Sequence, residues 1–517
     1  MAAPEELAPL TGAAKILGTV SLALATFMNV LDTSIANVSL SSIGGDLGVS
    51  TTQVTWVITS FGVANAIAVP LTGWLSQRFG AVRLFTASIV LFSIASLLCG
   101  LSRSLQELIV FRVLQGAVAG PMIPLSQALL LSSFSKAKAG TALAIWAMTT
   151  LVAPVMGPLL GGWITDNISW PWIFYINIPV GVFAAAATWG IYASRETARR
   201  KLPIDGVGLG LLIVWVGALQ IMLDKGQELD WFHSSAIVAL AVIAAVVFCF
   251  FVAWELLDNP YPVVDLRLFK RRNFWTGTLA FALGYGVFFG NVVVLPLWLQ
   301  QYMGYTATEA GMLTAPVGIL ALLLSPLIGR WVGRFDPRWL ASVAFLIFAI
   351  ALYMRTAYNT QANFGFLVLP IIVQGAGMAF FFVPLVSLVL SGLPPDRVPA
   401  ASGLSNFARI VSGSFGTSIA TTLWDNRAIL HHAQLTEYVN TSSTATTGYM
   451  QTLQAGGLSL SQAGAAIDRT IEVESHLLAA NDLFWISSIL FLAMIGVIWL
   501  ARPIKANLAP GTAGGAH

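Results

Sequence analysis

The chain contains a succession of long apolar segments that are almost free of charge, and this feature limits its fold more than any other. A helix that crosses the hydrocarbon core of a bilayer needs about 20 apolar residues. Fourteen segments have about this length, and the sequence predicts a transmembrane helix in each: 14–37, 54–75, 84–102, 105–130, 140–164, 172–193, 207–223, 235–257, 273–300, 308–330, 338–357, 363–391, 399–423 and 481–501. The polar stretch LSRSLQE separates the third segment from the fourth.

The composition agrees with this interpretation. Hydrophobic residues make up 57% of the chain and charged residues 9%, whereas soluble domains have about 45–50% and about 25%. A soluble protein of 517 residues could not cover its surface with so few charges, so apolar side chains must face lipid. We therefore predict an all-α integral membrane protein with many spans.

Several classes of function find no support in the sequence. The net charge is only +3 and the charges are dispersed, so we expect no nucleic-acid partner. The two cysteines, Cys99 and Cys249, lie inside apolar segments and predict neither a disulfide framework nor a metal site. The chain lacks HExxH, P-loop and strand-flanked GxSxG motifs, so we predict no enzyme activity, no cofactor and no metal.

The N-terminal residues MAAPEELAPLTGAAK lack the basic region of a cleavable signal peptide. We therefore expect the first apolar segment to be a permanent span. Basic residues predict the orientation of the spans, since short loops rich in Lys and Arg face the cytoplasm.

The loops after the second, fourth, sixth, eighth, tenth and twelfth segments contain Arg78 and Arg83; Lys136 and Lys138; Arg195, Arg199, Arg200 and Lys201; Arg267, Lys270, Arg271 and Arg272; Arg330, Arg334 and Arg338; and Arg397. The alternate loops, such as SSIGGDLGVSTTQ and QQYMGYTATE, are nearly free of basic residues. Both termini are therefore expected in the cytoplasm.

One external segment, residues 424–480, is long and polar, and it contains helical patches such as AILHHAQLTEYV. Its two histidines, His431 and His432, fit solvated positions better than catalytic ones. A solvated external loop is the simpler interpretation. A docking surface for another protein is the alternative, because long loops are often functional.

A weak internal repeat suggests how the spans are organised. GWLSQRFGAVR (73–83) follows the second span and GRWVGRFDPR (329–338) follows the tenth. Repeated halves are common in secondary transporters. We therefore expect an N-terminal six-helix bundle in residues 1–200, an inserted helix pair in 201–265, and a C-terminal six-helix bundle in 266–517 that carries the external segment 424–480.

Two opposite charges are expected at the same depth in the membrane. At about 1.5 Å per residue, Asp32 lies about 12 Å and Arg112 about 10 Å below the outer ends of their spans. Gln115 follows Arg112 on nearly the same helix face. Ionisable groups within spans usually have a function, but the pair could also lock two helices together, and Asp32 could cap a helix restart.

The fifth span contains APVMGPLLGG, residues 153–162. Pro154 and Pro158 would kink an ordinary helix, while Gly157, Gly161 and Gly162 leave one face without side chains. Such a face permits close helix contact in a membrane. The segment is therefore predicted either to pack tightly or to slide or hinge against a neighbour.

These residues resemble a known family, the major facilitator superfamily, in its branch of fourteen-helix drug:proton antiporters. GWLSQRFGAVR, with Gly73, Arg78, Gly80 and Arg83, is similar to the family's loop motif after the second helix. LIVFRVLQGAVAG resembles its fourth-helix arginine motif, APVMGPLLGG its fifth-helix antiporter signature, and LDTSIANVSL and WIFYINIPVG motifs of the fourteen-helix branch.

The resemblance implies two six-helix bundles around a central cavity that opens alternately to either side, and proton coupling through Asp32, Arg112 and Gln115. TWVITSFGVANAI, VAGPMIPLSQALLL, LQIMLDKGQELDWF and HHAQLTE look like the inner-membrane pumps of bacterial tripartite efflux systems. That closer resemblance implies export of hydrophobic, drug-like compounds, a periplasmic adaptor and an outer-membrane channel. One residue departs from the loop motif, because Gln77 stands where the family has Asp; the second copy keeps Asp336.

Aromatic and polar residues of the ninth, twelfth and thirteenth spans are candidates for the substrate cavity. They are Phe281, Tyr285, Phe288, Asn291, Phe380, Phe381 and Arg409. Any one of them could instead face lipid or the packed interior, and Arg409 could extend its charge to the cytoplasmic surface.

Two other functions fit the sequence less well. One is a symporter that imports nutrients; the Gly-Pro segment and the lack of polar substrate anchors argue against it. The other is a membrane enzyme or receptor, which should show several convergent polar groups at one depth, whereas the sequence shows one charge pair.

Overall fold

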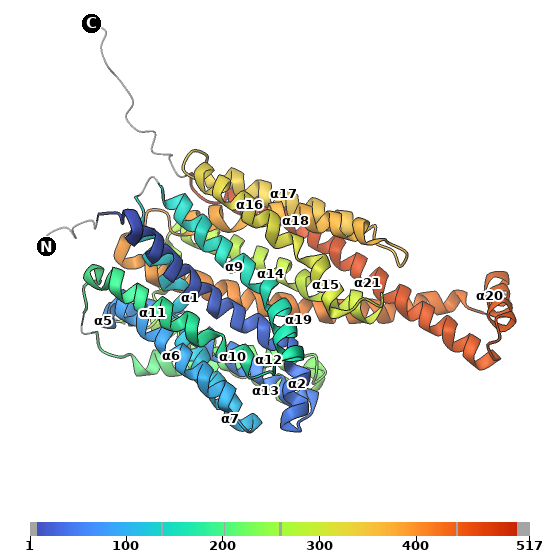
Figure 1. Cartoon of the computed structure of the whole chain (residues 1–517). Coiled ribbons are helices and arrows are strands. Elements are labelled where there is room, and N and C mark those ends of the chain that lie inside the picture. The colour runs from blue at the N-terminus through green and yellow to red at the C-terminus, as the bar shows by residue number, and fades with distance from the viewer. Residues whose placement is uncertain (1–7, 136–137, 201, 258–260, 441–442, 504–517) are drawn as a thin grey trace, which may run out of the picture.

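The computed structural model describes residues 8–135, 138–200, 202–257, 261–440 and 443–503. Within these residues it consists of helices and turns, without β-strands (Figure 1). The predicted all-α class is confirmed. Lys136 and Lys201 of the predicted basic loops lie outside the described residues.

Six spans form from the first part of the chain. Their helices are α1 (Gly12–Val38), α2 (Leu40–Leu47), α3 (Thr51–Val54), α4 (Trp56–Ala68), α5 (Thr72–Phe79), α6 (Ala81–Leu101), α7 (Leu105–Ala119), α8 (Met122–Ser133), α9 (Ala139–Asn167), α10 (Trp172–Tyr175), α11 (Asn177–Tyr192) and the 3₁₀ turn η2 (Ala193–Arg195). The end of the bundle at which α1 begins and α21 ends is called the terminal face below.

The rest of the chain supplies eight more spans. Its helices are α12 (Gly206–Lys225), η3 (Trp231–His233), α13 (Ser235–Leu256), η4 (Leu266–Lys270), α14 (Arg272–Gln301), α15 (Ala307–Thr314), α16 (Pro316–Trp331), α17 (Pro337–Arg355), α18 (Phe364–Val389), η5 (Pro395–Arg397), α19 (Val398–Tyr438), α20 (Thr444–Ala455) and α21 (Leu460–Trp499).

The fourteen predicted spans all correspond to helices. Eleven helical stretches in the described residues are long and apolar enough to cross a membrane, and two further spans are bent pairs. One pair is α4 and α5, which meet at 62° around Pro70, as expected where a proline interrupts a helix. The predicted separation of the third and fourth spans is correct, because α6 ends at Leu101 and Ser104 caps α7 by accepting a hydrogen bond from the Glu107 N–H.

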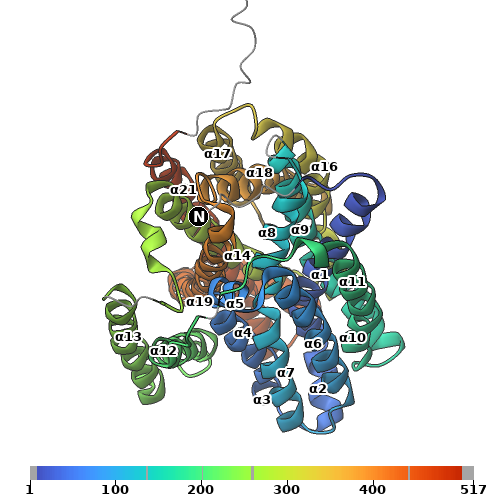
Figure 2. The same cartoon turned by 90° about the vertical axis from the view of Figure 1, so that its left-hand side faces the viewer.

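The thirteenth predicted span, which lies in α19, is more polar than the others because it lies inside the molecule. Ser402, Ser405, Asn406 and Ser418 on this helix are all buried. It packs against α14 and α21 on one side and against α8 and α12 on the other, and Figure 2 shows it near the middle of the assembly.

Helices α12 and α13 form a pair beside the two bundles (Figure 2). Polar contacts fasten α12 and the turn after it to α19. Gln220 donates to Ser414 Oγ at 2.8 Å, Ser418 Oγ donates to the Leu223 carbonyl at 2.8 Å, and Trp231 donates to Thr422 at 2.9 Å.

The external segment 424–480 was expected to be a loop with helical patches, but most of it is helical. Helix α19 continues to Tyr438, and α21 begins at Leu460, so both project beyond the other helices and carry α20 at the tip (Figure 1). Side chains join the two projections: His431 Nε2 lies 2.8 Å from Asp482 Oδ2, and Trp424 donates to the His476 carbonyl at 2.9 Å. We call residues 424–480 the projecting hairpin.

Candidate functional site

The predicted partners Asp32 and Arg112 form a buried ion pair. Arg112 Nη1 lies 2.5 Å from Asp32 Oδ2, joining α7 to α1. Gln115 accepts a hydrogen bond from the same Nη1 at 2.8 Å, and its Nε2 donates to Asp32 Oδ1 at 2.9 Å. All three side chains are at most 1% exposed. The predicted proximity of Asp32 and Arg112, which rested on their equal depth in the membrane, is therefore confirmed.

Two further residues complete the network, and the sequence argument missed both. Asn177, at the start of α11, donates to Asp32 Oδ1 at 3.1 Å and to Ser96 Oγ at 3.0 Å. Ser96 on α6 donates in turn to the Phe174 carbonyl at 2.9 Å. Asp32 Oδ1 thus accepts two amide N–H groups, whereas Oδ2 faces the guanidinium. Small polar residues occur in many spans, so no sequence pattern distinguishes these two.

Arg112 is held from several directions. Its Nε donates to the Val57 carbonyl at 2.9 Å, and its guanidinium lies 4.2 Å from the ring centroid of Phe61. Both residues lie on α4, which therefore fixes the cation independently of Asp32. A buried ion pair is stable only when its remaining hydrogen-bonding groups are satisfied, and this arrangement meets that condition. The carboxylate can lose its charge by protonation, whereas the guanidinium cannot.

The glycine face of α9 lies against α1 next to Asp32. A methyl group added at Gly157 would overlap the Ser34 side chain, and one added at Gly161 would press on Ile35. Gly162 makes only an ordinary contact with Val38. The two parts of α9, Ala139–Pro154 and Leu159–Asn167, meet at 41°. The predicted close packing of this segment is therefore present; Pro154 is exposed, and the side chain of Pro158 lies outside the description.

The loop motif 73–83 holds the segment that follows α11. Arg78 donates to the Leu202 carbonyl, and Gln77 accepts at its own carbonyl a 2.8 Å hydrogen bond from the Arg200 N–H. Gly80, with φ of 92°, makes the turn between α5 and α6; a side chain is strained in that conformation.

Glu196 supplies a carboxylate that the motif lacks at Gln77. It accepts the backbone N–H groups of Val82 and Arg83 at 3.0 and 2.9 Å, where α6 begins. A negative charge is favourable at a helix N-terminus. Arg78 contacts the Leu202 carbonyl and Arg83 contacts Glu196, so both arginines contact the segment after α11.

Small residues bring the two halves of the chain together near the terminal face. A methyl group at Gly73 would overlap Ala400 at the start of α19. Gly140 on α9 and Gly329 on α16 approach each other so closely that a side chain on either would overlap the other's carbonyl. Gln127 on α8 accepts a hydrogen bond from Ser402 on α19. The halves are therefore packed tightly at this end.

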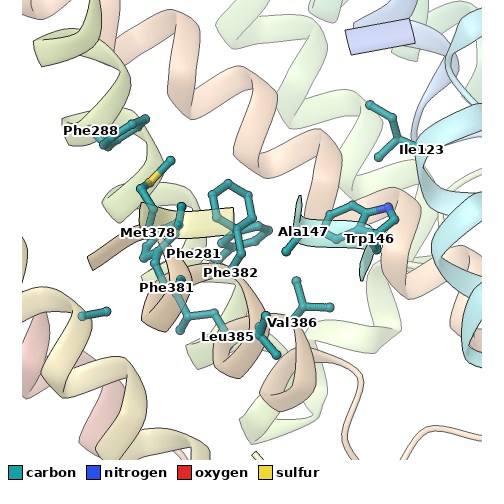
Figure 3. Close-up of a cluster of buried hydrophobic side chains, with 14 of the residues drawn as sticks. Ile123, Trp146, Ala147, Phe281, Phe288, Met378, Phe381, Phe382, Leu385 and Val386 are labelled. Atoms are coloured by element: carbon teal, nitrogen blue, oxygen red, sulfur yellow. The ribbon is translucent and has the colours of Figure 1, made fainter. Parts of the chain in front are cut away.

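The predicted cavity aromatics lie in a buried cluster between the halves. In Figure 3, Phe281 and Phe381 lie close together, and Ile123 and Trp146 from the N-terminal half lie across from them. Phe381 is 5.5 Å from Phe281 between ring centroids. Phe288 packs 5.8 Å from Phe348, farther inside the C-terminal bundle.

Phe382, which the sequence argument did not select, contacts two aromatic residues of α14. Its ring centroid is 5.6 Å from Phe281 and 6.3 Å from Tyr285. Phe380 instead contacts Trp331 on α16 at 6.2 Å. Helical periodicity alone could not decide that Phe381 and Phe382 face α14 whereas Phe380 faces α16.

Two polar candidates have different surroundings. Asn291 is buried and donates to Ser487 Oγ at 2.9 Å, which links α14 to α21. Arg409 is 7% exposed; its Nε donates to Asn406 at 3.3 Å, and its guanidinium lies 4.6 Å from the Tyr285 ring centroid. Among the described residues, no carboxylate lies within ion-pair distance of Arg409.

Comparison with known proteins agrees with this architecture. Residues 22–417 match the model of the Major Facilitator Superfamily. The chain is 50% identical over 510 residues to "Multidrug export protein EmrB" of Escherichia coli (strain K12), covering 98% of this chain and 99% of that one. It is 49% identical over 495 residues to "Fatty acid resistance protein FarB" of Neisseria gonorrhoeae, covering 96% and 97%.

Solved structures of the same architecture are more distant in sequence. The proton:xylose symporter XylE has a TM-score of 0.61 at 15% identity, over 94% of this chain and 95% of that one. The human organic anion transporter MFSD10 has a TM-score of 0.59 at 14% identity, over 94% and 99%. Family match, full-length relatives and fold agree: this multi-pass membrane protein belongs to the major facilitator superfamily.

Proposed function

We propose that the protein is a proton-coupled multidrug efflux antiporter that exports hydrophobic compounds from the cytoplasm and inner membrane by alternating access. The single observation that carries the proposal is the fully buried Asp32–Arg112 pair within two membrane spans. Ionisable groups in such positions are costly and usually functional. The 50% identity to a multidrug export protein over nearly the whole chain supports the transported class.

Protonation of Asp32 has a specific structural consequence. Oδ1 already accepts N–H groups from Gln115 and Asn177, so the proton binds at Oδ2. The new O–H group then faces the N–H of Arg112, and two donors oppose each other where a salt bridge was. The pair separates, and α1 is released from α7. The proton drives transport because it binds one conformation more tightly than the other.

The glycine face of α9 transmits this change. Ser34 and Ile35, which contact Gly157 and Gly161, follow Asp32 on α1 within one helical turn. The other end of α9 contacts the C-terminal half through Gly140 and Gly329. A shift of α1 therefore reaches the contact between the halves through one helix.

The two halves are proposed as the moving bodies: residues 1–200 and 266–517, with 201–265 as the inserted pair. The hydrogen bonds from α12 to Ser414 and Ser418 favour movement of the pair with the C-terminal half. Basic loops orient both termini to the cytoplasm. With the terminal face packed shut at Gly73 and Ala400, the conformation is closed on the side assigned to the cytoplasm.

The substrate cavity is proposed between the cluster of Figure 3 and Arg409. Aromatic rings with few polar groups suit hydrophobic drugs. Phe281, Tyr285 and Phe382 supply the rings, and Arg409 supplies a cation without an acidic partner among the described residues. The fatty-acid resistance named for one relative is consistent with an amphiphilic substrate at such a site.

The projecting hairpin is proposed to bind a periplasmic adaptor of EmrA type, which would connect the pump to an outer-membrane channel of TolC type. Its helices continue from α19 and α21 beyond the other spans, and His431, Asp482 and Trp424 stiffen its stem. Replacing residues 440–458 with a short Gly-Ser linker should keep transport in liposomes and abolish resistance in cells. Full resistance in cells would place the adaptor site elsewhere.

Proton flux in liposomes tests the function directly. Purified protein is reconstituted with a pH-sensitive dye inside, and hydrophobic drugs are added under an imposed proton gradient. Addition of a transported drug should move protons in the direction opposite to the drug, and collapse of the gradient should stop uphill transport. Drug movement that is unaffected by the gradient would contradict proton coupling, and proton and drug movement in the same direction would indicate a symporter.

A further inference from the structure

A cavity lies between the inserted helix pair and the C-terminal half. Its volume is about 520 Å³, a size that accommodates a small organic ligand. Apolar side chains from α12, α13, η4 and α19 form most of its wall, among them Trp215, Phe251, Leu404 and Phe407, and Lys270 is its one charged residue. Asp32 and Arg409 do not contribute to it.

The cavity exists because α13 is poorly supported by the rest of the protein. In the most apolar stretch of α13, 17% of the residues are buried, against 44% in that of α12. It packs mainly on α12 and on the turns η3 and η4 (Figure 2). The Trp215 ring of α12 lies between α13 and α19, 4.9 Å from Phe248 and 5.7 Å from Phe407. The described residues do not fill the space beside this ring.

The cavity opens to the membrane and runs inward from the terminal face. Phe248 and Leu256 line it and are 44% and 49% exposed, so lipid reaches it from the side. Lys270 marks its terminal-face end, at the last residue of η4. From there the wall continues to Phe248, eight residues before the end of α13, which at about 1.5 Å per residue is a depth of about 12 Å.

We propose that this cavity binds one acyl chain of an anionic phospholipid from the leaflet at the terminal face, with its phosphate at Lys270. Apolar walls open to the bilayer suit a hydrocarbon chain, and a lysine at the membrane surface attracts anionic head groups. Arg267 and Arg271 stand near Lys270 in the chain and increase the positive charge there. In the proposed orientation this is the cytoplasmic leaflet. The lipid fills the space between α13 and α19 and fixes the inserted pair to the transporter.

Photocrosslinking tests the assignment. Wild-type protein in nanodiscs is labelled with a phosphatidylglycerol whose acyl chain carries a photoreactive group, and labelled peptides are identified by mass spectrometry. Labels should map to the peptides around Phe251 and Phe407. The same chain on phosphatidylcholine should label them about fivefold less, because its choline cation cancels the net negative charge that attracts Lys270.

Three variants sharpen the test. Val252→Trp fills the cavity and should abolish labelling there, whereas Val246→Trp, on the 48% exposed lipid side of the same helix, should not. Lys270→Gln should reduce phosphatidylglycerol labelling to the phosphatidylcholine level, while Arg330→Gln, at the end of α16, should leave it unchanged. Equal labelling in Val252→Trp and wild type would overturn the proposal. So would labelling of these peptides by a photoreactive drug but not by the lipid, because the cavity would then serve substrates.

Discussion

The two halves of the molecule carry the same polar positions but different charges. The sequence QGA occurs at residues 115–117 on α7 and again at 374–376 on α18, the fourth span of each half. The structure confirms that these positions correspond, since each glycine packs on a backbone carbonyl of the second span in its own half. Gly116 meets Phe61, and Gly375 meets Val317.

The first span of each half is bonded to the sixth span in a corresponding way. In the N-terminal half Asp32 on α1 accepts a hydrogen bond from Asn177 on α11. In the C-terminal half Asn291 on α14 donates to Ser487 on α21. The site is therefore repeated, with an amide in the second copy where the first copy has a carboxylate.

The buried arginine also lies on a different span in the C-terminal half. Ile371 stands three residues before Gln374, where Arg112 stands before Gln115. A buried arginine is present instead on the third span of the C-terminal half, where Arg355 donates to Gln374. Its partner is neutral. A proton can therefore change the charge of the carboxylate at the Asp32–Arg112 site, whereas the Arg355–Gln374 pair contains no carboxylate.

The largest effect is expected from removing the carboxylate. Asp32→Asn keeps the shape and hydrogen bonding of the side chain but cannot exchange a proton, so uphill transport and drug-induced proton release should fall to the level of empty liposomes. Drug binding, measured on purified protein, should persist. The matched change Asn291→Ala in the other half should retain most of the transport, because no titrating group is lost there.

Wild-type rates in Asp32→Asn, together with a normal response to a pH gradient, would make Asp32 a structural partner of Arg112. Loss of transport in both variants alike would instead show that the two halves share the coupling.

The next effect concerns stability. Arg112→Met leaves Asp32 as a buried, uncompensated charge, which costs about 3–5 kcal/mol. Arg355→Met leaves only the neutral Gln374 without its partner, which costs about 1–3 kcal/mol. Unfolding in detergent should therefore occur at a much lower temperature for Arg112→Met. The double variant Asp32→Asn, Arg112→Met should recover most of this loss; without recovery, Arg112 would be stabilising through Val57 and Phe61 instead.

A third comparison lies within α9. Gly157 faces Ser34 and Gly162 has room beside Val38, so the two positions form a matched pair. Gly157→Val should force α9 away from α1 and reduce transport strongly, while Gly162→Val should change it little. Transport assays on both variants at equal expression decide the matter. Equal activities would reduce the glycine face to ordinary packing.

The positions of the spans could be predicted from the sequence because lipid imposes a length and a hydropathy on each. The sequence also predicted the Asp32–Arg112 contact, since two charges at one depth must pair. It could not predict the projecting hairpin, because a polar helix outside the membrane has no hydropathy limit. Nor could it select Asn177 or Phe382, since their roles depend on the rotation of each helix about its axis, which packing determines.

The smallest effect is expected at the loop motif, where the two halves differ again. In the second copy Asp336 caps α17 and lies 2.7 Å from Arg338, within the loop itself. In the first copy Glu196, more than a hundred residues along the chain, takes this role at α6.

Replacing Arg78 and Arg83 together by Gln should therefore loosen the segment 196–202 and slow transport severalfold, without abolishing drug binding. Glu196→Gln should give a similar change, because α6 loses the charge at its N-terminus. The interface between the halves at this point is made by Gly73 and Ala400, which these variants leave intact. Transport rates and drug affinity measured side by side separate the possibilities. An unchanged transport rate in the double variant would mean that Arg78 and Arg83 serve only to orient the protein in the membrane. Loss of drug binding would mean that they contribute to the substrate cavity.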